Sequence, residues 1–352
     1  MYESCFPIHG IGVKLSTKSF AICEAFSDLS QDSLGSEAIT SDVRVELHAI
    51  AHLNQIPTTI LKSKCNLIRR KGKLEKEVKR FGLTYEFYQD QEKLVIELYQ
   101  YGLIFINGPG ALARAYLVKP ESMDLELRSF FVNVAIAELL RWKGLYEIHA
   151  VAMERFGKGV MIAGKPGLGK TTAGLSLLRA GYGFISDDFP FLRIKESRIE
   201  ILAGHDRIDV REKTLGFFPE LQTIPLTRRD RSKKDSFYVN DLFPGTKVDS
   251  CECHLLLFPQ VVSEKQSYLK PMSKHLALKE LLPQGLLIHD KEIAKREFQL
   301  YSTLVERTPC YRLHYGEDRW DLPTLLDPIL QKCCGDGSQM GVRAASFTNA
   351  AV

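Results

Sequence analysis

The sequence has no apolar run that approaches about 18 residues, the length that a transmembrane helix needs, so we expect no membrane association. Its N-terminus lacks a basic segment followed by an apolar core, and we therefore expect no secretory signal. The formal net charge of +4 over 352 residues does not by itself indicate nucleic-acid binding. With 45% apolar and 26% charged residues, the composition predicts a soluble globular protein.

A zinc-binding cysteine pattern is also missing, because no CxxC pair is followed by a second such pair. The eight cysteines are scattered along the chain, at Cys5, Cys23, Cys65, Cys251, Cys253, Cys310, Cys333 and Cys334. Scattered thiols of this kind are typical of a reducing compartment. We therefore predict a cytoplasmic protein.

The length predicts two domains, and the pattern along the chain indicates an α/β protein. Residues 1–120 are β-rich: residues 42–48 alternate between apolar and polar side chains, and residues 84–88 and 93–98 flank a turn, as in a hairpin. Apolar residues at helical spacing predict a helix over 125–142, within a connecting segment at 121–145. We expect a second domain at 146–331 and a disordered tail, rich in Gly, Ser and Ala, at 332–352.

A basic stretch from Lys62 to Arg80 contains nine basic and two acidic residues. It is interpreted either as a solvated loop or helix face, or as a docking surface for an acidic partner. Nucleic acid is the least favoured occupant, because no aromatic residues are interleaved to stack on bases.

The strongest motif is a glycine-rich loop that follows an apolar run at 159–163 and precedes a helical pattern at 172–180. Gly164, Gly169, Lys170 and Thr171 satisfy the spacing GxxxxGK[ST]. In such a loop, backbone N–H groups converge on phosphate oxygens, the lysine reaches the β and γ phosphates, and the hydroxyl coordinates Mg²⁺. The sequence therefore predicts binding of ATP or GTP, with phosphate-binding residues Gly164, Lys165, Pro166, Gly167, Leu168, Gly169, Lys170, Thr171 and Thr172.

Two adjacent carboxylates, Asp187 and Asp188, follow a short strand pattern at 181–186. Ligands of open α/β sheets bind at the carboxyl ends of strands, so this position favours a functional pair over a simple turn. One carboxylate can hold Mg²⁺, and its neighbour can accept a proton from an attacking hydroxyl.

Three further features are weighed between functional and structural roles. His149 lies in an expected strand at 147–153 that would form a hairpin with the strand before the loop, so it either serves the site or is structural. Arg207 and Arg211 either neutralise a transferred phosphate or are simply exposed. The basic loop at 227–235 is either a mobile surface loop, a docking loop, or a lid that closes on phosphates.

Residues 149–188, with the histidine, the hairpin, the loop, the phrase Arg179-Ala180-Gly181 and the Asp pair in this order, resemble the catalytic domain of HPr kinase/phosphorylase and its related kinases. The resemblance implies a mixed sheet related to phosphoenolpyruvate carboxykinase, joined to an N-terminal β-rich domain. It implies protein-serine phosphorylation with a triphosphate and Mg²⁺. Lys170 would hold phosphate, Thr171 and Asp187 would serve Mg²⁺, Asp188 or its neighbour would be the general base, and His149 would assist at the phosphate.

The sequence departs from that family within the loop, where Lys165 and Pro166 replace an acidic residue and a serine. We therefore favour a kinase whose hydroxyl acceptor is another protein, a peptide or a small molecule. The alternative is a nucleotide-binding switch or assembly protein with slow hydrolysis, and a third hypothesis is a degenerate binding protein. Homo-oligomerisation is left open.

Overall fold

The structure is a computed structural model, and it describes residues 1–26, 41–65, 68–71, 85–89, 92–229, 234–285, 291–318 and 320–332. Most of the basic stretch from Lys62 to Arg80 lies outside the described residues; only backbone elements that end at Cys65 and run from Ile68 to Lys71 are described there. Of the expected tail, only the first residue is described.

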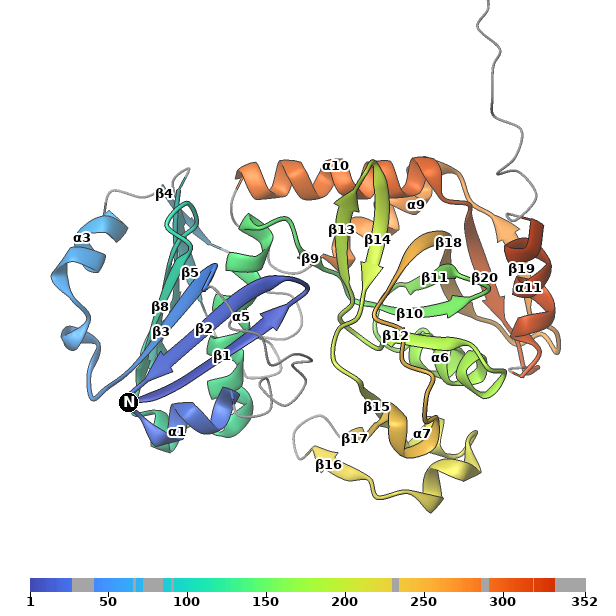
Figure 1. Cartoon of the computed structure of the whole chain (residues 1–352), viewed down its shortest axis with the longest axis horizontal. Coiled ribbons are helices and arrows are strands. Elements are labelled where there is room, and N and C mark those ends of the chain that lie inside the picture. The colour runs from blue at the N-terminus through green and yellow to red at the C-terminus, as the bar shows by residue number, and fades with distance from the viewer. Residues whose placement is uncertain are drawn as a thin grey trace, which may run out of the picture.

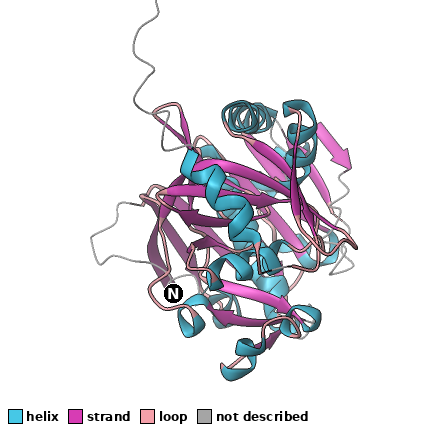
Figure 2. Ribbon diagram, turned by 90° about the vertical axis from the view of Figure 1, so that its right-hand side faces the viewer, coloured by secondary structure: helices cyan, strands magenta, loops and turns pink. Residues whose placement is uncertain are grey.

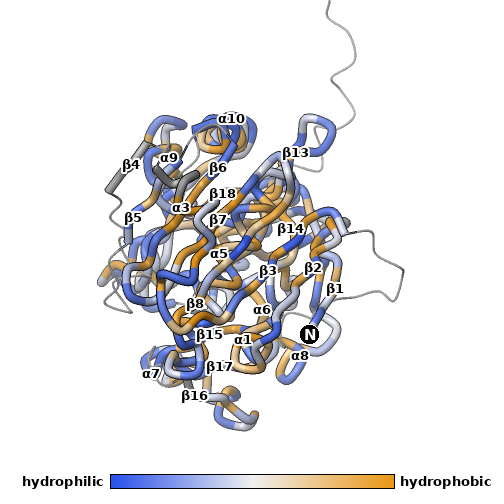
Figure 3. Tube along the Cα trace, turned by 90° about the vertical axis from the view of Figure 1, so that its left-hand side faces the viewer, coloured by the Kyte–Doolittle hydropathy of each residue, from blue (hydrophilic) through white to orange (hydrophobic). Residues whose placement is uncertain are grey.

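The chain forms two units side by side, each built on its own mixed sheet (Figure 1). The N-terminal unit, residues 1–142, has an eight-stranded sheet in the order β1-β2-β3-β8-β7-β6-β5-β4. Its strands are β1 (Tyr2–Ile8), β2 (Ile11–Thr17), β3 (Val43–Ile50), β4 (Ile68–Lys71), β5 (Glu86–Gln89), β6 (Lys93–Leu98), β7 (Gly102–Asn107) and β8 (Leu112–Val118). The alternating segment at 42–48 is thus a strand, and β5 and β6 form the predicted antiparallel hairpin. Hydrophilic and hydrophobic residues alternate along β3 of this sheet (Figure 3).

Helix α5 (Leu125–Trp142) covers one face of this sheet. Its N-terminus is capped by Asp124, whose side chain accepts a hydrogen bond from the Leu127 amide at 2.8 Å. Phe131 and Leu139 are fully buried among strand residues such as Leu117. The helix was expected as a connector between domains, but its apolar stripe packs on β3, β7 and β8, so it belongs to the core of the N-terminal unit.

Short elements complete the N-terminal unit. The helix α1 (Phe20–Cys23) and the 3-10 turn η1 (Glu24–Phe26) lie beside α5, whereas α3 (Thr58–Cys65) follows the turn η2 (Leu53–Gln55) on the opposite face. The turns η3 (Tyr99–Tyr101) and η4 (Pro120–Ser122) connect the later elements.

The C-terminal unit, residues 146–332, is built on a nine-stranded sheet whose main path is β12-β10-β11-β18-β14-β13-β9, with β20 beside β18 and β19 beside β20. The central strand β18 carries a continuous buried run at 255–258, as expected for a strand covered on both faces. The strands are β9 (Tyr146–Glu147), β10 (Ala150–Arg155), β11 (Lys158–Ala163), β12 (Gly183–Ser186), β13 (Phe191–Lys195), β14 (Arg198–Leu202), β18 (Ser250–Val261), β19 (Tyr268–Pro271) and β20 (Cys310–Tyr315).

Helices cover both faces of this second sheet, giving three layers (Figure 2). On one face lie α6 (Lys170–Arg179) and α11 (Leu322–Lys332); on the other lie α9 (Lys274–Leu281), the turn η6 (Leu282–Gln284) and α10 (Lys291–Arg307). A small antiparallel sheet of β15 (Arg207–Arg211), β17 (Lys234–Tyr238) and β16 (Thr227–Arg229) packs below α6 with α7 (Glu212–Leu215), η5 (Pro219–Thr223) and α8 (Val239–Leu242) (Figure 1). In the part of the chain that the structure describes, no helix is long and apolar enough to cross a membrane.

The turn between β1 and β2 inserts into the C-terminal unit. His9 Nε2 lies 2.6 Å from the carbonyl oxygen of Ala203, and the His9 ring meets Phe191 edge-on at 5.6 Å between centroids. The guanidinium of Arg193 donates to the His9 carbonyl oxygen at 3.4 Å. Burial, and then the charge of Arg193, lower the pKa of His9, although the contact with the Ala203 carbonyl opposes them.

This junction predicts an acid-sensitive stability. His9 is neutral when folded, so its stabilising contribution is complete above its ordinary pKa of 6.5 and is lost as the pH falls toward the lowered folded-state pKa. The negative charges of Asp249 and Glu200 act to raise the pKa of His9. They therefore reduce the stability that is lost at low pH. We expect the urea midpoint of the wild-type protein to fall more between about pH 7.5 and about pH 5.5 than that of His9→Gln. Equal falls would contradict this account.

Candidate active site

The glycine-rich loop joins the end of β11 to the start of α6. Gly164, Gly167 and Gly169 all have positive φ angles, of 156°, 86° and 90°. Gly169 is the N-cap of α6, and a Cβ there would lie 3.3 Å from the Tyr315 ring, so glycine suits both the conformation and the space. The first-turn N–H groups of α6 therefore open toward the loop, which is the arrangement that binds anions at a helix N-terminus.

Lys170 opens helix α6 and is only 5% exposed. Its Nζ donates to the carbonyl oxygen of Gly164 at 2.8 Å and is 3.4 Å from that of Lys165. The ammonium group thus lies inside the curve of the loop, where a bound phosphate would meet both the charge and the N–H groups.

Thr171 and Asp187 face each other across the site. The Thr171 hydroxyl donates to Asp187, at 3.2 Å from Oδ1 and 3.3 Å from Oδ2. Asp187 follows β12, which pairs with β10, so the sheet brings this carboxylate to the helix start. Burial, and next the charge of Asp188, raise the pKa of Asp187 well above its ordinary value, with Lys234 and Lys170 acting in the opposite direction. A buried carboxylate of this kind is suited to binding a cation.

Asp188 has different neighbours from Asp187. Its Oδ1 is 3.3 Å from His149 Nε2, and its Oδ2 is 3.3 Å from Lys234 Nζ. Burial acts to raise the pKa of Asp188, but the His149 hydrogen bond and the charge of Lys234 outweigh it and hold the pKa below its ordinary value. The backbone has a φ of 72°, in the left-handed region that non-glycine residues rarely adopt and that functional sites often contain.

His149 does not lie within a strand at 147–153, as we expected, but in the break between β9 and β10. The break arises because the amide of His149 donates to the carbonyl oxygen of Gln284 at 2.8 Å, away from the sheet. The amide of Ile148 still donates to the carbonyl oxygen of Pro190 at 3.1 Å, in register with the pairing of β9 and β13. β10 and β11 do form the expected antiparallel hairpin, with Ala150 opposite Ala163. The hairpin places His149 near the loop, and the break turns its ring toward Asp188.

The small sheet supplies a residue that the sequence did not single out. Lys234 begins β17, and its Nζ lies 3.3 Å from Asp188 and 3.8 Å from Asp209. It was seen only as one cation of the basic loop at 227–235, of which residues 230–233 lie outside the description. The two arginines weighed as phosphate ligands have different surroundings. Arg207 Nε lies 3.9 Å from Asp209 Oδ1, whereas Arg211 is exposed to solvent.

The donor set suits a hard divalent cation. Among the described residues no group of three or more His, Cys, Asp or Glu side chains could hold a metal ion by itself. Mg²⁺ does not need such a group, because it is usually bound through one or two carboxylates together with substrate phosphates and water. The Thr171 hydroxyl and the Asp187 carboxylate, beside a phosphate-type loop, fit that requirement.

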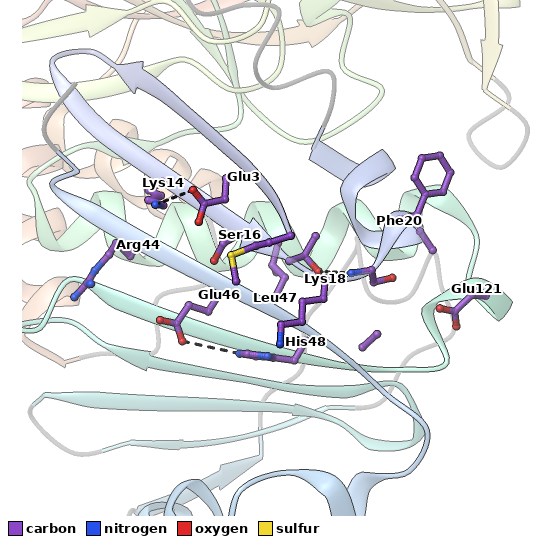
Figure 4. A pocket seen from close by; sticks show the side chains of 15 residues that line it. Glu3, Lys14, Ser16, Lys18, Phe20, Arg44, Glu46, Leu47, His48 and Glu121 are labelled. Carbon is purple, nitrogen blue, oxygen red and sulfur yellow. Dashed lines mark hydrogen bonds and ion pairs between the residues drawn. The ribbon is translucent and has the colours of Figure 1, made fainter. Parts of the chain in front are cut away.

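A groove of about 860 Å³ lies far from this loop, on the N-terminal sheet (Figure 4). Two pairs of its side chains lie close together: Lys14 with Glu3 at 3.0 Å, and Glu46 with His48 at 3.9 Å. We place the chemistry at the loop rather than in this groove, because the loop concentrates the anion-binding and carboxylate groups.

Comparison with known proteins shows that the same segment is similar to one family. A family model described as HPr Serine kinase C-terminal domain matches residues 144–212. HPr kinase/phosphorylase from Polaromonas naphthalenivorans is 39% identical over 77 residues, which are 21% of this chain and 24% of that protein. HPr kinase/phosphorylase from Verminephrobacter eiseniae is 44% identical over 77 residues, with the same shares, and the protein of that name from Streptococcus pyogenes is 35% identical over 60 residues, 17% of each chain.

A solved structure, the Hpr(Ser) kinase/phosphatase from Coxiella burnetii, matches with a TM-score of 0.30 and 13% identity, covering 53% of this chain and 95% of that one. The chain spans about a quarter of the length of the first curated relatives that it matches. The matched residues include the loop, His149 and both aspartates. The predicted resemblance is therefore confirmed: between residues 144 and 212 this α/β protein is HPr-kinase-like.

Proposed function

We propose that this chain is a kinase that transfers the terminal phosphoryl group of ATP or GTP, with Mg²⁺, to a hydroxyl group. The acceptor is a protein, a peptide or a small molecule, and we expect the hydroxyl group that is phosphorylated to be that of a serine. One observation carries the proposal: a phosphate-type loop, a Thr171–Asp187 contact and a second carboxylate on Asp188 converge at one place. We assign the surrounding mixed sheet to the type found in HPr kinase and phosphoenolpyruvate carboxykinase.

In this proposal the loop binds the phosphates before any chemistry occurs. The N–H groups at the start of α6 and the Lys170 ammonium group lie on the inner side of the loop. They would hold the β and γ phosphates and stabilise the charge that spreads over the transferred group. Thr171 and Asp187 would hold Mg²⁺, which neutralises charge on the phosphate oxygens when bound.

Asp188 would receive the proton of the attacking hydroxyl. Its lowered pKa keeps it ionised at neutral pH, so its oxygen can accept the hydroxyl hydrogen bond and then the proton. His149 holds one oxygen of this carboxylate at 3.3 Å and fixes its direction. Lys234 lies at the other oxygen and supplies positive charge near the transferred group.

A nucleotide switch with slow hydrolysis would use the same loop but would need no base for an acceptor hydroxyl. The two functions differ in where the γ phosphate goes. We expect γ-labelled triphosphate, incubated with the protein and fractionated cell extract, to label a specific acceptor faster than it releases free phosphate. Release of free phosphate alone, at a rate unaffected by any fraction, would support the switch instead.

The metal assignment predicts a difference between two substitutions at Thr171. Thr171→Ser retains the hydroxyl that faces Asp187, whereas Thr171→Val retains the shape and removes it. We expect Thr171→Val to raise the Mg²⁺ concentration needed for half-maximal nucleotide binding by about 10- to 100-fold. Thr171→Ser should need a Mg²⁺ concentration close to that of the wild type. Titration of Mg²⁺ against nucleotide affinity measures this. Indistinguishable titrations for the two variants would remove Thr171 from the metal site.

A further inference from the structure

A group of charged and hydroxyl side chains is buried where α5 of the N-terminal unit meets α10 of the C-terminal unit. We call it the buried cluster, and it consists of Glu138, Arg141, Glu297 and Tyr301. None of the four is more than 2% exposed. Burying charges in this way is unfavourable unless they are paired, and a cluster of this kind needs a physical reason.

Pairing within the buried cluster is tight on both helices. Arg141 Nη1 donates to Glu138 Oε1 at 2.5 Å within α5, and the Tyr301 hydroxyl donates to Glu297 Oε1 at 2.5 Å within α10. Burial opposes the charge of Arg141, but the carboxylates of Glu138 and then Glu297 outweigh it and raise the Arg141 pKa. Burial raises the pKa of Glu297 and the charge of Arg141 opposes this rise, so Arg141 of the N-terminal unit acts on Glu297 of the C-terminal unit. The start of α10 reaches over the end of α5, where Arg296 lies 6.0 Å above the Trp142 ring (Figure 1).

Glu297 is placed where an apolar residue would be expected. It lies on the buried stripe of α10 with Ile293, Leu300 and Leu304. A helix that buries a carboxylate on its apolar stripe gives up hydrophobic contact at that position. The Glu297 carboxylate and the Tyr301 hydroxyl lie against another segment of the chain instead.

They touch a strap formed by residues 282–285, which follows α9. A Cβ on Gly285 would lie 2.4 Å from Glu297 Oε1 and 2.8 Å from the Tyr301 hydroxyl. Only glycine permits this approach, so the strap backbone rests directly on the polar ends of the cluster. The preceding residue, Gln284, is also buried, with an exposed fraction of 5%. This side of the strap is therefore packed against the rest of the protein.

The other side of the strap holds the backbone of His149. The carbonyl oxygen of Gln284 accepts a hydrogen bond from the His149 amide at 2.8 Å, and Gly285 forms an isolated antiparallel bridge with Ile148. These contacts create the break between β9 and β10 that turns the His149 ring toward Asp188. A continuous set of contacts therefore runs from α5 through α10 and the strap to the candidate active site.

We propose that the buried cluster is a positioning element for His149 and acts through the strap. The Glu297 carboxylate and the Tyr301 hydroxyl set the position of the strap. The strap in turn holds the His149 backbone so that the imidazole contacts Asp188. The N-terminal unit thereby shapes the site of the C-terminal unit through Arg141. The value of this positioning for phosphoryl transfer rests on the proposed function, but the positioning itself can be measured without turnover.

The first test uses two tyrosine substitutions that remove equivalent bonds. Tyr301→Phe removes the 2.5 Å bond to Glu297, and Tyr182→Phe removes the 2.5 Å bond from the hydroxyl of another fully buried tyrosine to Asp327, after the end of α6 and away from the strap. We expect hydrogen exchange of the His149 amide to accelerate by about tenfold in Tyr301→Phe, the order expected for one weakened hydrogen bond, and to stay unchanged in Tyr182→Phe. Unchanged exchange in Tyr301→Phe, or equal acceleration in both variants, would overturn the proposal.

A second test remains informative if a single variant is unstable. Gly285→Ala should displace the strap because its methyl group meets Glu297, and Glu297→Ala should make room for that methyl group. We expect the effect of Gly285→Ala on His149 exchange to be several-fold smaller in the Glu297→Ala background. Additive effects would mean that the strap does not rest on the cluster, and would contradict the proposal.

Kinetics separate this proposal from the proposed function. If the chain is a kinase, Tyr301→Phe lowers kcat for phosphoryl transfer with little change in the KM for triphosphate, because His149 meets Asp188 and not the loop. A wild-type protein that transfers no phosphate, with the expected exchange result, would reject the proposed function and keep the positioning. If the wild type transfers phosphate but hydrogen exchange of the His149 amide is unchanged in Tyr301→Phe, the proposed function is kept and the positioning is rejected.

Discussion

Replacing Lys170 by methionine is expected to lower phosphoryl transfer by about 10³-fold, because a positive charge directed at the transferred group is lost from a buried site. Methionine retains the methylene stem, so the packing at the start of α6 is retained. The Nζ hydrogen bond to the carbonyl oxygen of Gly164 is lost with the charge. Triphosphate affinity should fall as well, since the lysine would contact the β and γ phosphates before reaction. Transfer and equilibrium binding of nucleotide are the two measurements.

A matched control is available in Lys158, the other buried lysine in the described part of the chain whose Nζ donates to a backbone carbonyl oxygen. Lys158 is 7% exposed, and its Nζ donates to the carbonyl oxygen of Leu330, in α11, at 2.9 Å. This hydrogen bond does not involve the loop. Lys158→Met removes an equally buried charge and should reduce stability without a comparable effect on transfer. If both methionine variants lost transfer equally, the effect of Lys170→Met would reflect folding and not phosphate binding.

Asp188→Asn is expected to separate binding from chemistry. Asparagine has the same shape but cannot take up the proton of an acceptor hydroxyl, so transfer should fall by about 10²- to 10⁴-fold. Triphosphate affinity should change little, because the side chain of Asp188 contacts His149 and Lys234. Transfer at saturating triphosphate, together with the dissociation constant, measures both effects.

Asp206→Asn provides the comparison for Asp188→Asn. Asp206 also pairs with a lysine, Lys247, at 2.9 Å, but it lies outside the pair at the end of β12. Its substitution should leave transfer near the wild-type rate. Normal transfer by Asp188→Asn would show that the proton acceptor is another group, and Asp187 would be the next to replace.

The sequence predicted the part of the site that is local in the chain. The spacing of Gly164, Gly169 and Lys170 determines a strand, a loop and a helix within a few residues, and physical constraints on phosphate binding leave little choice of residue type. The position of Asp187 and Asp188 after a strand could also be predicted, because the helix between loop and strand is short. Strand β3, the hairpin of β5 and β6, and the helix at 125–142 followed from simple periodicity, whereas β1, β4 and β8 were not predicted.

Long-range contacts could not be predicted in the same way. Lys234 reaches Asp188 only because β17 pairs with β15 in a small sheet, and nothing in its local sequence distinguishes it from neighbouring cations. The strand break at His149 depends on a carbonyl of Gln284, which is distant in sequence. The only local signal for the buried cluster was a glutamate, Glu297, on the apolar stripe of an amphipathic helix.

The chemical nature of the labelled product tests the central claim most directly. The protein, supplied with γ-labelled triphosphate, Mg²⁺ and the acceptor fraction, should produce a phosphate ester of an alcohol, which survives acid treatment and yields phosphoserine if the acceptor is a protein or peptide. The same incubation with Asp188→Asn should yield almost none. An acid-labile phosphate on nitrogen or on a carboxyl group, or label found only as free phosphate, would contradict hydroxyl phosphorylation at this site.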